Sequence, residues 1–152
     1  MKDIVVLDTN IFINAIFDRA NYPNDFNLLK LESQGIFQLA FSKYTADELF
    51  KIMSRHINDE NVFECSDFFI TLSRVIERSI IRDHPATNTP ITNRSDQNFV
   101  DLAIDVKAAY LITNDLESGI LQRKNLNGVT FFTPFQYVHN YYRNTSKVNN
   151  TP

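Results

Sequence analysis

The sequence predicts an α/β protein of three layers, in which helices cover both faces of a mainly parallel sheet. Short apolar runs alternate along the chain with longer segments of helical periodicity, and this alternation is typical of that fold class. The first run, 4–7, is apolar at every position, as expected for a parallel strand buried on both faces. Helical connections between such strands form right-handed crossovers.

The first half of the chain contains clear local signals. Gly35 follows a helical segment and suits the left-handed conformation that often ends a helix. Ser42 precedes another helical segment and is a good N-cap residue. The elements expected here are a strand at 4–7, helices at about 10–18 and between 24 and 35, a strand at 36–41, helices at about 43–57 and 62–78, and a weak strand at 79–82.

The second half continues the alternation. Residues 84–90 are the clearest loop, Ser95 is placed to cap the next helix, and 127–128 (Asn-Gly) indicate a tight turn. The polar segment 144–152 is expected to be a frayed tail, so that one domain spans 1–143. The elements expected here are a helix at 96–107, a strand at 109–113, a short helix ending near 124, a strand at 129–132 and a helix from Pro134.

Composition places the chain among compact proteins of one domain. Its 152 residues are 43% apolar and include 13 Phe, which suffices for a core and argues against global disorder. The formal net charge of −3 does not indicate a basic nucleic-acid-binding surface, but bound cations reverse the field of clustered acids. The single Cys65 fits a reducing compartment. No apolar run reaches membrane length or suits a signal peptide, so a cytoplasmic location is expected.

Two predicted strands are followed by acids in similar surroundings. Asp8 follows the first strand within the letters LDTN, and Asp115 follows the strand at 109–113 within ITND. The carboxyl ends of parallel strands open onto one edge of the sheet, where α/β proteins bind ligands. The two carboxylates therefore converge if their strands are neighbours. Taken alone, Asp8 also suits a turn or a helix cap.

Two predicted helices carry further acids. Asp96 lies in the first turn of the helix that precedes the second of these strands, although the helix dipole also stabilises acids there. Glu48 borders the apolar stripe of the third helix, although a solvated Glu is common at such positions. Asp47 and Asp101 are neighbouring acids that are able to exchange roles with Glu48 and Asp96.

A site of four carboxylates predicts a bound cation. Neighbouring carboxylates repel one another, and either a cation or a proton on one acid relieves the repulsion. Sets of oxygen ligands favour hard ions such as Mg²⁺ and Mn²⁺. Such an ion lowers the pKa of a bound water and neutralises charge on phosphate oxygens, which is the chemistry of phosphodiester hydrolysis. The sequence offers no convincing His, Ser or Cys nucleophile for another mechanism.

Four segments, in order, resemble the PIN domain family: VVLDTNIFINAIF, YTADELFKIMSR, SDQNFVDLA and AAYLITND. The resemblance spans 2–141 and is greatest to stand-alone VapC-like toxins of toxin–antitoxin pairs. It implies a PIN-like fold and a Mg²⁺- or Mn²⁺-dependent ribonuclease that acts on RNA and is held inactive by an antitoxin. The helix over 62–78, with Phe68 and Phe69 side by side, indicates an apolar face for an antitoxin or for a second copy in a homodimer.

The resemblance also implies roles for individual residues. One or two metal ions would be held by Asp8, Glu48, Asp96 and Asp115, with Asp101 as the alternative to Asp96. Hydrogen bonds from Thr9, Asn10, Thr113 and Asn114 would support these ligands. The segment 92–95 (Thr-Asn-Arg-Ser) is less acidic than the proline-containing run often found in related sequences. This departure leaves a second hypothesis open, a weak or inactive PIN scaffold that acts as a protein- or RNA-binding module.

Two other classes that place an Asp after the first strand fit this chain less well. A phosphatase of the haloacid dehalogenase kind needs a second Asp two residues on as general acid, where this chain has Asn10. A phospho-accepting receiver needs an acid pair near the start and a Lys after a late strand. Asp3 lies too early in the first strand to complete such a pair, and no suitable Lys is present.

Overall fold

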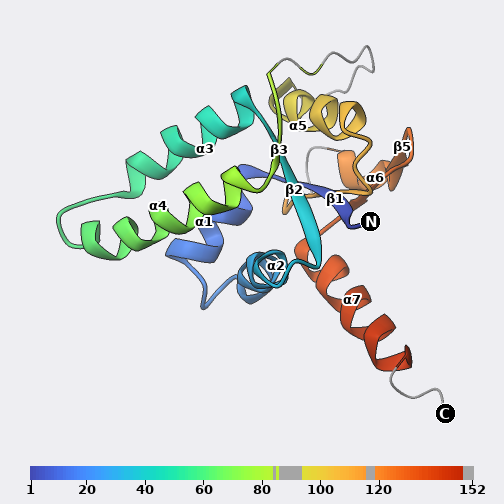
Figure 1. Cartoon of the computed structure of the whole chain (residues 1–152), viewed down its shortest axis with the longest axis horizontal. Helices are drawn as coiled ribbons and strands as arrows, with labels where there is room; N and C mark the ends of the chain where they lie inside the picture. The colour runs from blue at the N-terminus through green and yellow to red at the C-terminus, as the bar shows by residue number, and fades with distance from the viewer. Residues whose placement is uncertain (84, 86–93, 116–118, 149–152) are drawn as a thin grey trace.

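The computed structural model describes residues 1–83, 85, 94–115 and 119–148 and confirms the predicted fold class. The described chain forms a six-stranded sheet with helices on both faces (Figure 1). The strands are β1 (Asp3–Leu7), β2 (Phe37–Ser42), β3 (Ile80–Arg82), β4 (Tyr110–Ile112), β5 (Asn125–Leu126) and β6 (Val129–Phe132). The helices are α1 (Thr9–Phe17), α2 (Pro23–Ser33), α3 (Lys43–His56), α4 (Val62–Glu77), α5 (Arg94–Asp105), α6 (Ile120–Arg123) and α7 (Pro134–Val148).

Strand β1 lies in the middle of the sheet, whose order is β3-β2-β1-β4-β6-β5. It pairs in parallel with β2 on one side and with β4 on the other. Among the strands of the described residues, only β5 is antiparallel to its neighbour. From β1 the chain builds outward through β2 and β3, and then returns to place β4 on the opposite side of β1. The strand order therefore reverses between β1 and β4, which is where open α/β sheets form ligand-binding crevices.

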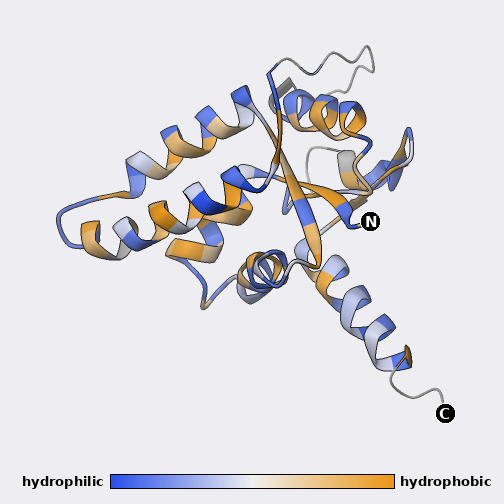
Figure 2. Cartoon of the chain, in the orientation of Figure 1, coloured by the Kyte–Doolittle hydropathy of each residue, from blue (hydrophilic) through white to orange (hydrophobic). Residues whose placement is uncertain are grey.

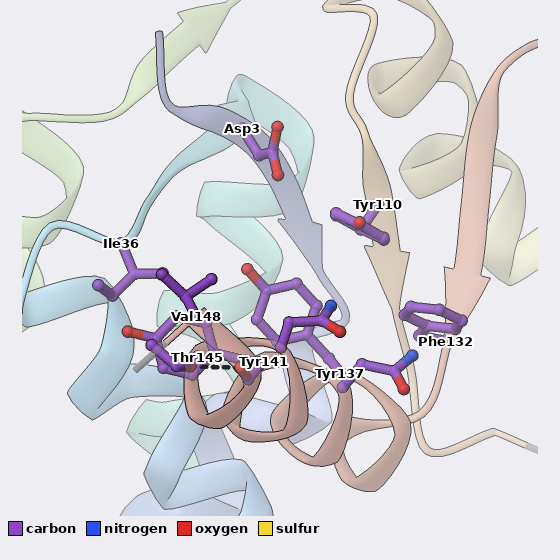
Figure 3. Close-up of a pocket in the computed structure, with 10 residues that line it drawn as sticks. Asp3, Ile36, Tyr110, Phe132, Tyr137, Tyr141, Thr145 and Val148 are labelled. Carbon is purple, nitrogen blue, oxygen red and sulfur yellow. Dashed lines mark hydrogen bonds between the residues drawn. The ribbon is translucent and has the colours of Figure 1, made fainter. Parts of the chain in front are cut away.

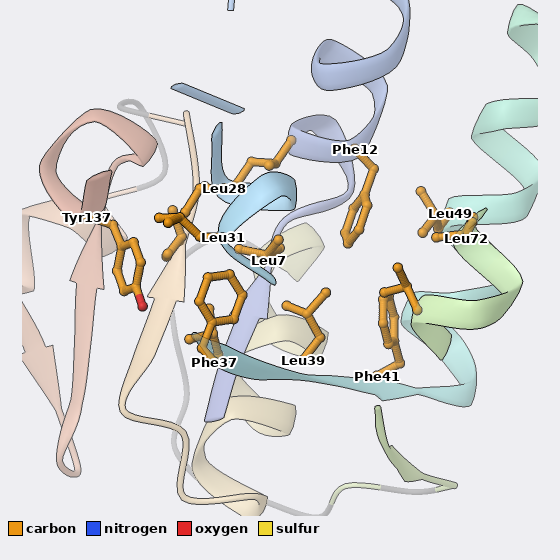
Figure 4. Packing of buried hydrophobic residues seen from close by; sticks show 14 of the residues in the cluster. Leu7, Phe12, Leu28, Leu31, Phe37, Leu39, Phe41, Leu49, Leu72 and Tyr137 are labelled. Atoms are coloured by element: carbon orange, nitrogen blue, oxygen red, sulfur yellow. The ribbon is translucent and has the colours of Figure 1, made fainter. Parts of the chain in front are cut away.

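Alternating side chains of β1 contribute to two separate cores. Val5 and Leu7 pack into the larger core with residues of α1, α2, α3, α4 and α7 (Figure 4). Val6 faces the other side, where α5 supplies most of the helical residues and Leu121 of α6 packs against them. Figure 2 shows apolar and polar residues alternating along α3, α4 and α5. Burial of Val5, Val6 and Leu7 between the two cores explains why this part of β1 is an unbroken apolar run.

Short local sequence patterns correctly predicted the ends of several helices and strands. Ser42 caps α3, because its hydroxyl accepts from the Thr45 N–H at 3.0 Å while the Thr45 hydroxyl accepts from the Ser42 N–H at 2.9 Å. Gly35 follows α2 with a φ of 73°, as predicted for a left-handed residue after a helix. The turn at Asn127 and Gly128 has φ values of 50° and 87°, which suit a tight hairpin between β5 and β6.

Other boundaries differ from the sequence-based expectations. Ser95 lies inside α5, so the prediction that it caps this helix is wrong: the helix begins one residue earlier, at Arg94, and serine is tolerated within a first turn. Strand β5 was not predicted, because two residues carry no periodicity. Helix α7 continues through Val148, into the segment expected to be a tail. Of the predicted loop at 84–90, only Pro85 lies among the described residues.

Within the described ranges, every helix is too short or too polar to cross a lipid bilayer.

Candidate metal centre

Asp8 and Asp115 lie together at the point where the strand order reverses. Leu7 of β1 pairs with Ile112 of β4, so both strands end at the same level and their following residues are neighbours. The Thr113 hydroxyl donates to Asp8 Oδ2 at 2.8 Å and accepts from the Asp115 backbone N–H at 3.0 Å. One buried hydroxyl therefore links the two segments that carry these acids.

The surroundings of Asp8 disfavour its negative charge. Burial raises the pKa of the Asp8 carboxyl above its ordinary value, and the nearby charge of Asp115 raises it further. Hydrogen bonds from Thr113 and from the Asn10 backbone N–H, the latter at 3.4 Å, oppose this shift without cancelling it. Asp8 also caps α1 through that second bond. A carboxyl in this position is stabilised either by a proton or by a nearby cation.

Glu48 reaches the same edge of the sheet from α3. The Thr9 hydroxyl donates to Glu48 Oε2 at 2.9 Å, and Thr9 is itself buried at the start of α1. Because Thr9 directly follows Asp8, this bond places Glu48 next to the end of β1. The alternative acid on this helix, Asp47, is exposed.

Asp96 and Asp101 lie at different levels of α5. This helix packs against β1 and β4 and leads into β4, so its amino end lies toward the edge where β4 ends. Asp96 is in the first turn and only 8% exposed. Asp101 lies about 7.5 Å further along the helix axis, at 1.5 Å per residue. Its Oδ1 accepts a hydrogen bond from the Gln97 side-chain amide at 2.6 Å, so both partners belong to α5.

Asp25 is a buried acid near this site that the sequence analysis did not identify. It is 2% exposed in the first turn of α2, and its Oδ2 accepts from the side-chain amides of Asn14 at 3.0 Å and Asn114 at 2.6 Å. Burial raises the pKa of Asp25, the two amides lower it, and the charge of Asp8 raises it again. An acid after Pro23 resembles an ordinary first-turn residue. The only sequence signal was Asn14, a polar residue within an apolar helix.

The two asparagines predicted to support the acids differ in their contacts. Asn114 directs its side-chain amide to Asp25, while Asn10 contributes its backbone N–H and has an exposed side chain. The hydroxyls of Thr9 and Thr113 instead contact Glu48 and Asp8.

The donor chemistry of this edge fits a hard divalent ion, because carboxylates and hydroxyls supply only oxygen. The charge of Asp8 interacts with those of Asp115 and Asp25, whereas Glu48 contacts Thr9. Across the described ranges, no three His, Cys, Asp or Glu side chains are gathered closely enough to hold an ion together.

A separate cavity lies toward the opposite end of the strands. It has a volume of about 460 Å³ and lies between α7 and the sheet (Figure 3). Asp3 and Tyr110, which begin β1 and β4, line it together with Tyr137 and Tyr141 of α7. Neither Asp8 nor Asp115 lines this cavity, so it is distinct from the acidic edge.

Comparison with known proteins identifies the family of this fold. No curated protein matches the chain. The fold is similar to a chain in the crystal structure of VapBC2 from Rickettsia felis bound to a DNA fragment from their promoter. That match has a TM-score of 0.55 and 21% sequence identity and covers 86% of this chain and 98% of that chain. Residues 4–117 match the family described as the PIN domain. This match spans most of the chain, including β1, β4 and the acids at their ends, and the chain therefore belongs to the PIN domain family.

Proposed function

We propose that this protein is a Mg²⁺- or Mn²⁺-dependent endoribonuclease and the toxin of a toxin–antitoxin pair. The observation that carries the proposal is the link through Thr113 between Asp8 and the Asp115 backbone, at the point where the strand order reverses. Membership of the PIN family makes phosphodiester hydrolysis the reaction to expect from acids at this position.

Asp8, Glu48, Asp96 and Asp115 are the residues that would hold one or two metal ions. The burial of Asp96 in the first turn of α5 supports it over Asp101 as the third acid. When bound, the ion would supply an activated water and would neutralise charge on the phosphate.

The chain's own residues would keep the carboxylates in position. Thr113 holds Asp8 Oδ2, and Thr9 holds Glu48 Oε2, so each threonine restricts the rotation of one acid. Ligands that are oriented in this way lose less conformational freedom when they bind an ion.

An antitoxin partner is supported by the fold likeness to VapBC2 and by the exposed apolar surface of α4. On this helix Phe63 is 85% exposed and Ile70 is 53% exposed. Phe68 and Phe69, on which the sequence-based prediction of an apolar face rested, are instead half-buried against the larger core. Exposed apolar residues on one helix suit a protein partner, which we propose to be the antitoxin. A second copy of the chain is the other partner that would fit this surface.

One observation favours a second function, that of a weak or inactive PIN scaffold that binds protein or RNA. Among the described residues, no three acids are gathered closely enough to hold an ion together. A scaffold of this kind would keep the fold and the threonine contacts but would not cleave RNA.

Cleavage of a mixed RNA pool distinguishes the two functions. We expect the wild-type protein to cleave with Mg²⁺ or Mn²⁺ and to stop with EDTA. Asp8→Asn and Asp115→Asn should both lower the rate by about 100-fold or more, since loss of a ligand exceeds the 10–100-fold cost of losing a supporting residue.

Asp47→Asn is the matched control, because Asp47 is an exposed acid on the helix that carries Glu48. It should cleave at the wild-type rate. Folded wild-type protein that does not cleave with either metal would support the scaffold. If Asp8→Asn cleaves as fast as the wild type, the activity arises elsewhere or from a contaminating nuclease.

A further inference from the structure

Asp25 joins three elements at a single oxygen atom. Its Oδ2 accepts one hydrogen bond from Asn14 of α1 and one from Asn114, which follows β4, while Asp25 itself lies in the first turn of α2. Asn114 and Asp25 are separated by 89 positions in the sequence. The contact is therefore a tertiary one, and it meets the chain at the residue immediately before Asp115.

A carboxylate at this position fixes both amide groups. An ionised carboxylate only accepts hydrogen bonds, so each asparagine must direct its NH₂ group to Asp25 and its oxygen away from it. Asp25 thereby holds the side chain of Asn114, while the adjacent Thr113 hydroxyl accepts a hydrogen bond from the Asp115 backbone N–H. The short segment 113–115 is anchored at consecutive residues.

Stabilisation of α2 does not by itself explain the burial of Asp25. Acids in the first turn of a helix interact favourably with its dipole while they remain in water. Asp25 is instead 2% exposed, and the burial of a charge is costly unless specific partners compensate it. Its partners are the two amides, one of which belongs to the segment that carries Asp115.

We propose that Asp25 is a positioning residue of the acidic site, which holds Asn114 and so fixes the segment that presents Asp115 beside Asp8. This inference rests on the proposed function, because it concerns the affinity of that site for its metal ion. Residues that orient metal ligands typically change the affinity by about 10–100-fold when they are removed.

The test is a titration of the folded protein with Mn²⁺ by calorimetry. Asp25→Leu removes both acceptor oxygens and should raise the dissociation constant by about 10–100-fold. Asp25→Asn retains one acceptor oxygen for the two amides and should recover most of the affinity.

Glu32→Leu is the matched control, because Glu32 is 4% exposed on the same helix but pairs with Arg78 at 2.6 Å, away from the acids. It should destabilise the fold and leave the dissociation constant close to that of the wild type. The side-chain amide protons of Asn114, followed by NMR, should lose their protection from exchange in Asp25→Leu and keep it in Glu32→Leu.

The outcomes separate the two proposals. If the wild type binds Mn²⁺ and cleaves RNA while Asp25→Leu binds Mn²⁺ as tightly as Glu32→Leu, the positioning role is overturned and the nuclease function stands. If the wild type neither binds Mn²⁺ nor cleaves, both proposals are overturned. If Asp25→Leu does not fold, Asn114→Leu takes its place: a loss of about 10-fold or more supports the role, and an unchanged affinity overturns it.

Discussion

Single hydroxyl groups orient two of the acids at the end of the sheet, Asp8 and Glu48. Thr113 is buried, and its one hydroxyl both donates to Asp8 and accepts from the Asp115 backbone. Thr9 makes the corresponding contact with Glu48. Thr9, just after β1, and Thr113, just after β4, therefore each orient one carboxylate, and their hydroxyls contact these acids and not solvent. The bonds compensate only part of the cost of burying Asp8, whose pKa remains raised.

The raised pKa of Asp8 predicts that this residue lowers stability at neutral pH when no metal is present. Its carboxyl titrates at a higher pH in the folded protein than its ordinary value of 3.8. The folded state therefore gains stability from Asp8 below that value and loses it as the pH rises through the folded pKa. Asp8→Asn removes the charge, and Asn is an equally good helix cap. We expect the variant to unfold at a higher temperature than the wild type at pH 7, by about 2–4 °C for each kcal/mol gained.

Thermal unfolding in EDTA at pH 7 and at pH 3 measures this effect. The difference between Asp8→Asn and the wild type should shrink at pH 3, where the wild-type carboxyl is protonated. Asp47→Asn provides the control, since Asp47 is exposed and its replacement should give no such pH-dependent gain. A variant that is less stable than the wild type at pH 7 would contradict the direction of the shift.

Helix α5 carries two candidate acids at different levels, and its orientation predicts which one matters. Its amino end lies toward the edge of the sheet where β1 and β4 end, and Asp96 is there, while Asp101 is more than a turn away and bonded to Gln97. We expect Asp96→Asn to lower the rate of metal-dependent RNA cleavage by about 100-fold or more, because loss of a metal ligand should exceed the cost of about 10–100-fold for loss of a supporting residue. Asp101→Asn should leave the cleavage rate nearly unchanged. Cleavage assays of the two variants at matched folding measure this, and the reverse order would assign the ligand to Asp101.

The elements that were predicted well are those whose ends depend on local chemistry. Ser42 and Gly35 determine helix ends through contacts within a few residues, so the sequence was sufficient there. Strand β5 exists because two residues pair with β6, and such a short segment has no pattern of its own. Asp25 was missed for a similar reason. Its position resembles that of any first-turn acid, and its burial depends on tertiary contacts that include Asn14 of α1 and Asn114.

The arrangement of the whole molecule brings these residues together. The chain places β2 and β3 on one side of β1 and β4 on the other, so that residues about a hundred positions apart, such as Asp8 and Thr113, become neighbours. Burial of β1 in both cores fixes its level relative to β4, because a shift of one residue would reverse which side chains face each core. The position of the acids is therefore a consequence of core packing, and their mutual repulsion is a cost that the fold sustains.

A cation that relieves this cost should stabilise the whole protein. An ion that binds only the folded state adds about 2.7 kcal/mol to the free energy of unfolding at one hundred times its dissociation constant. For a chain of this size, that gain corresponds to an increase in Tm of several degrees.

We expect Mn²⁺ and Mg²⁺ to raise the Tm of the wild type in a concentration-dependent manner, as measured by scanning calorimetry at constant ionic strength. Asp115→Asn should respond much less, and Asp47→Asn should respond like the wild type. A Tm that does not change with either ion, in protein that is folded and free of chelator, would argue for the inactive scaffold, because its acids would then not gather around an ion even when the ion is abundant.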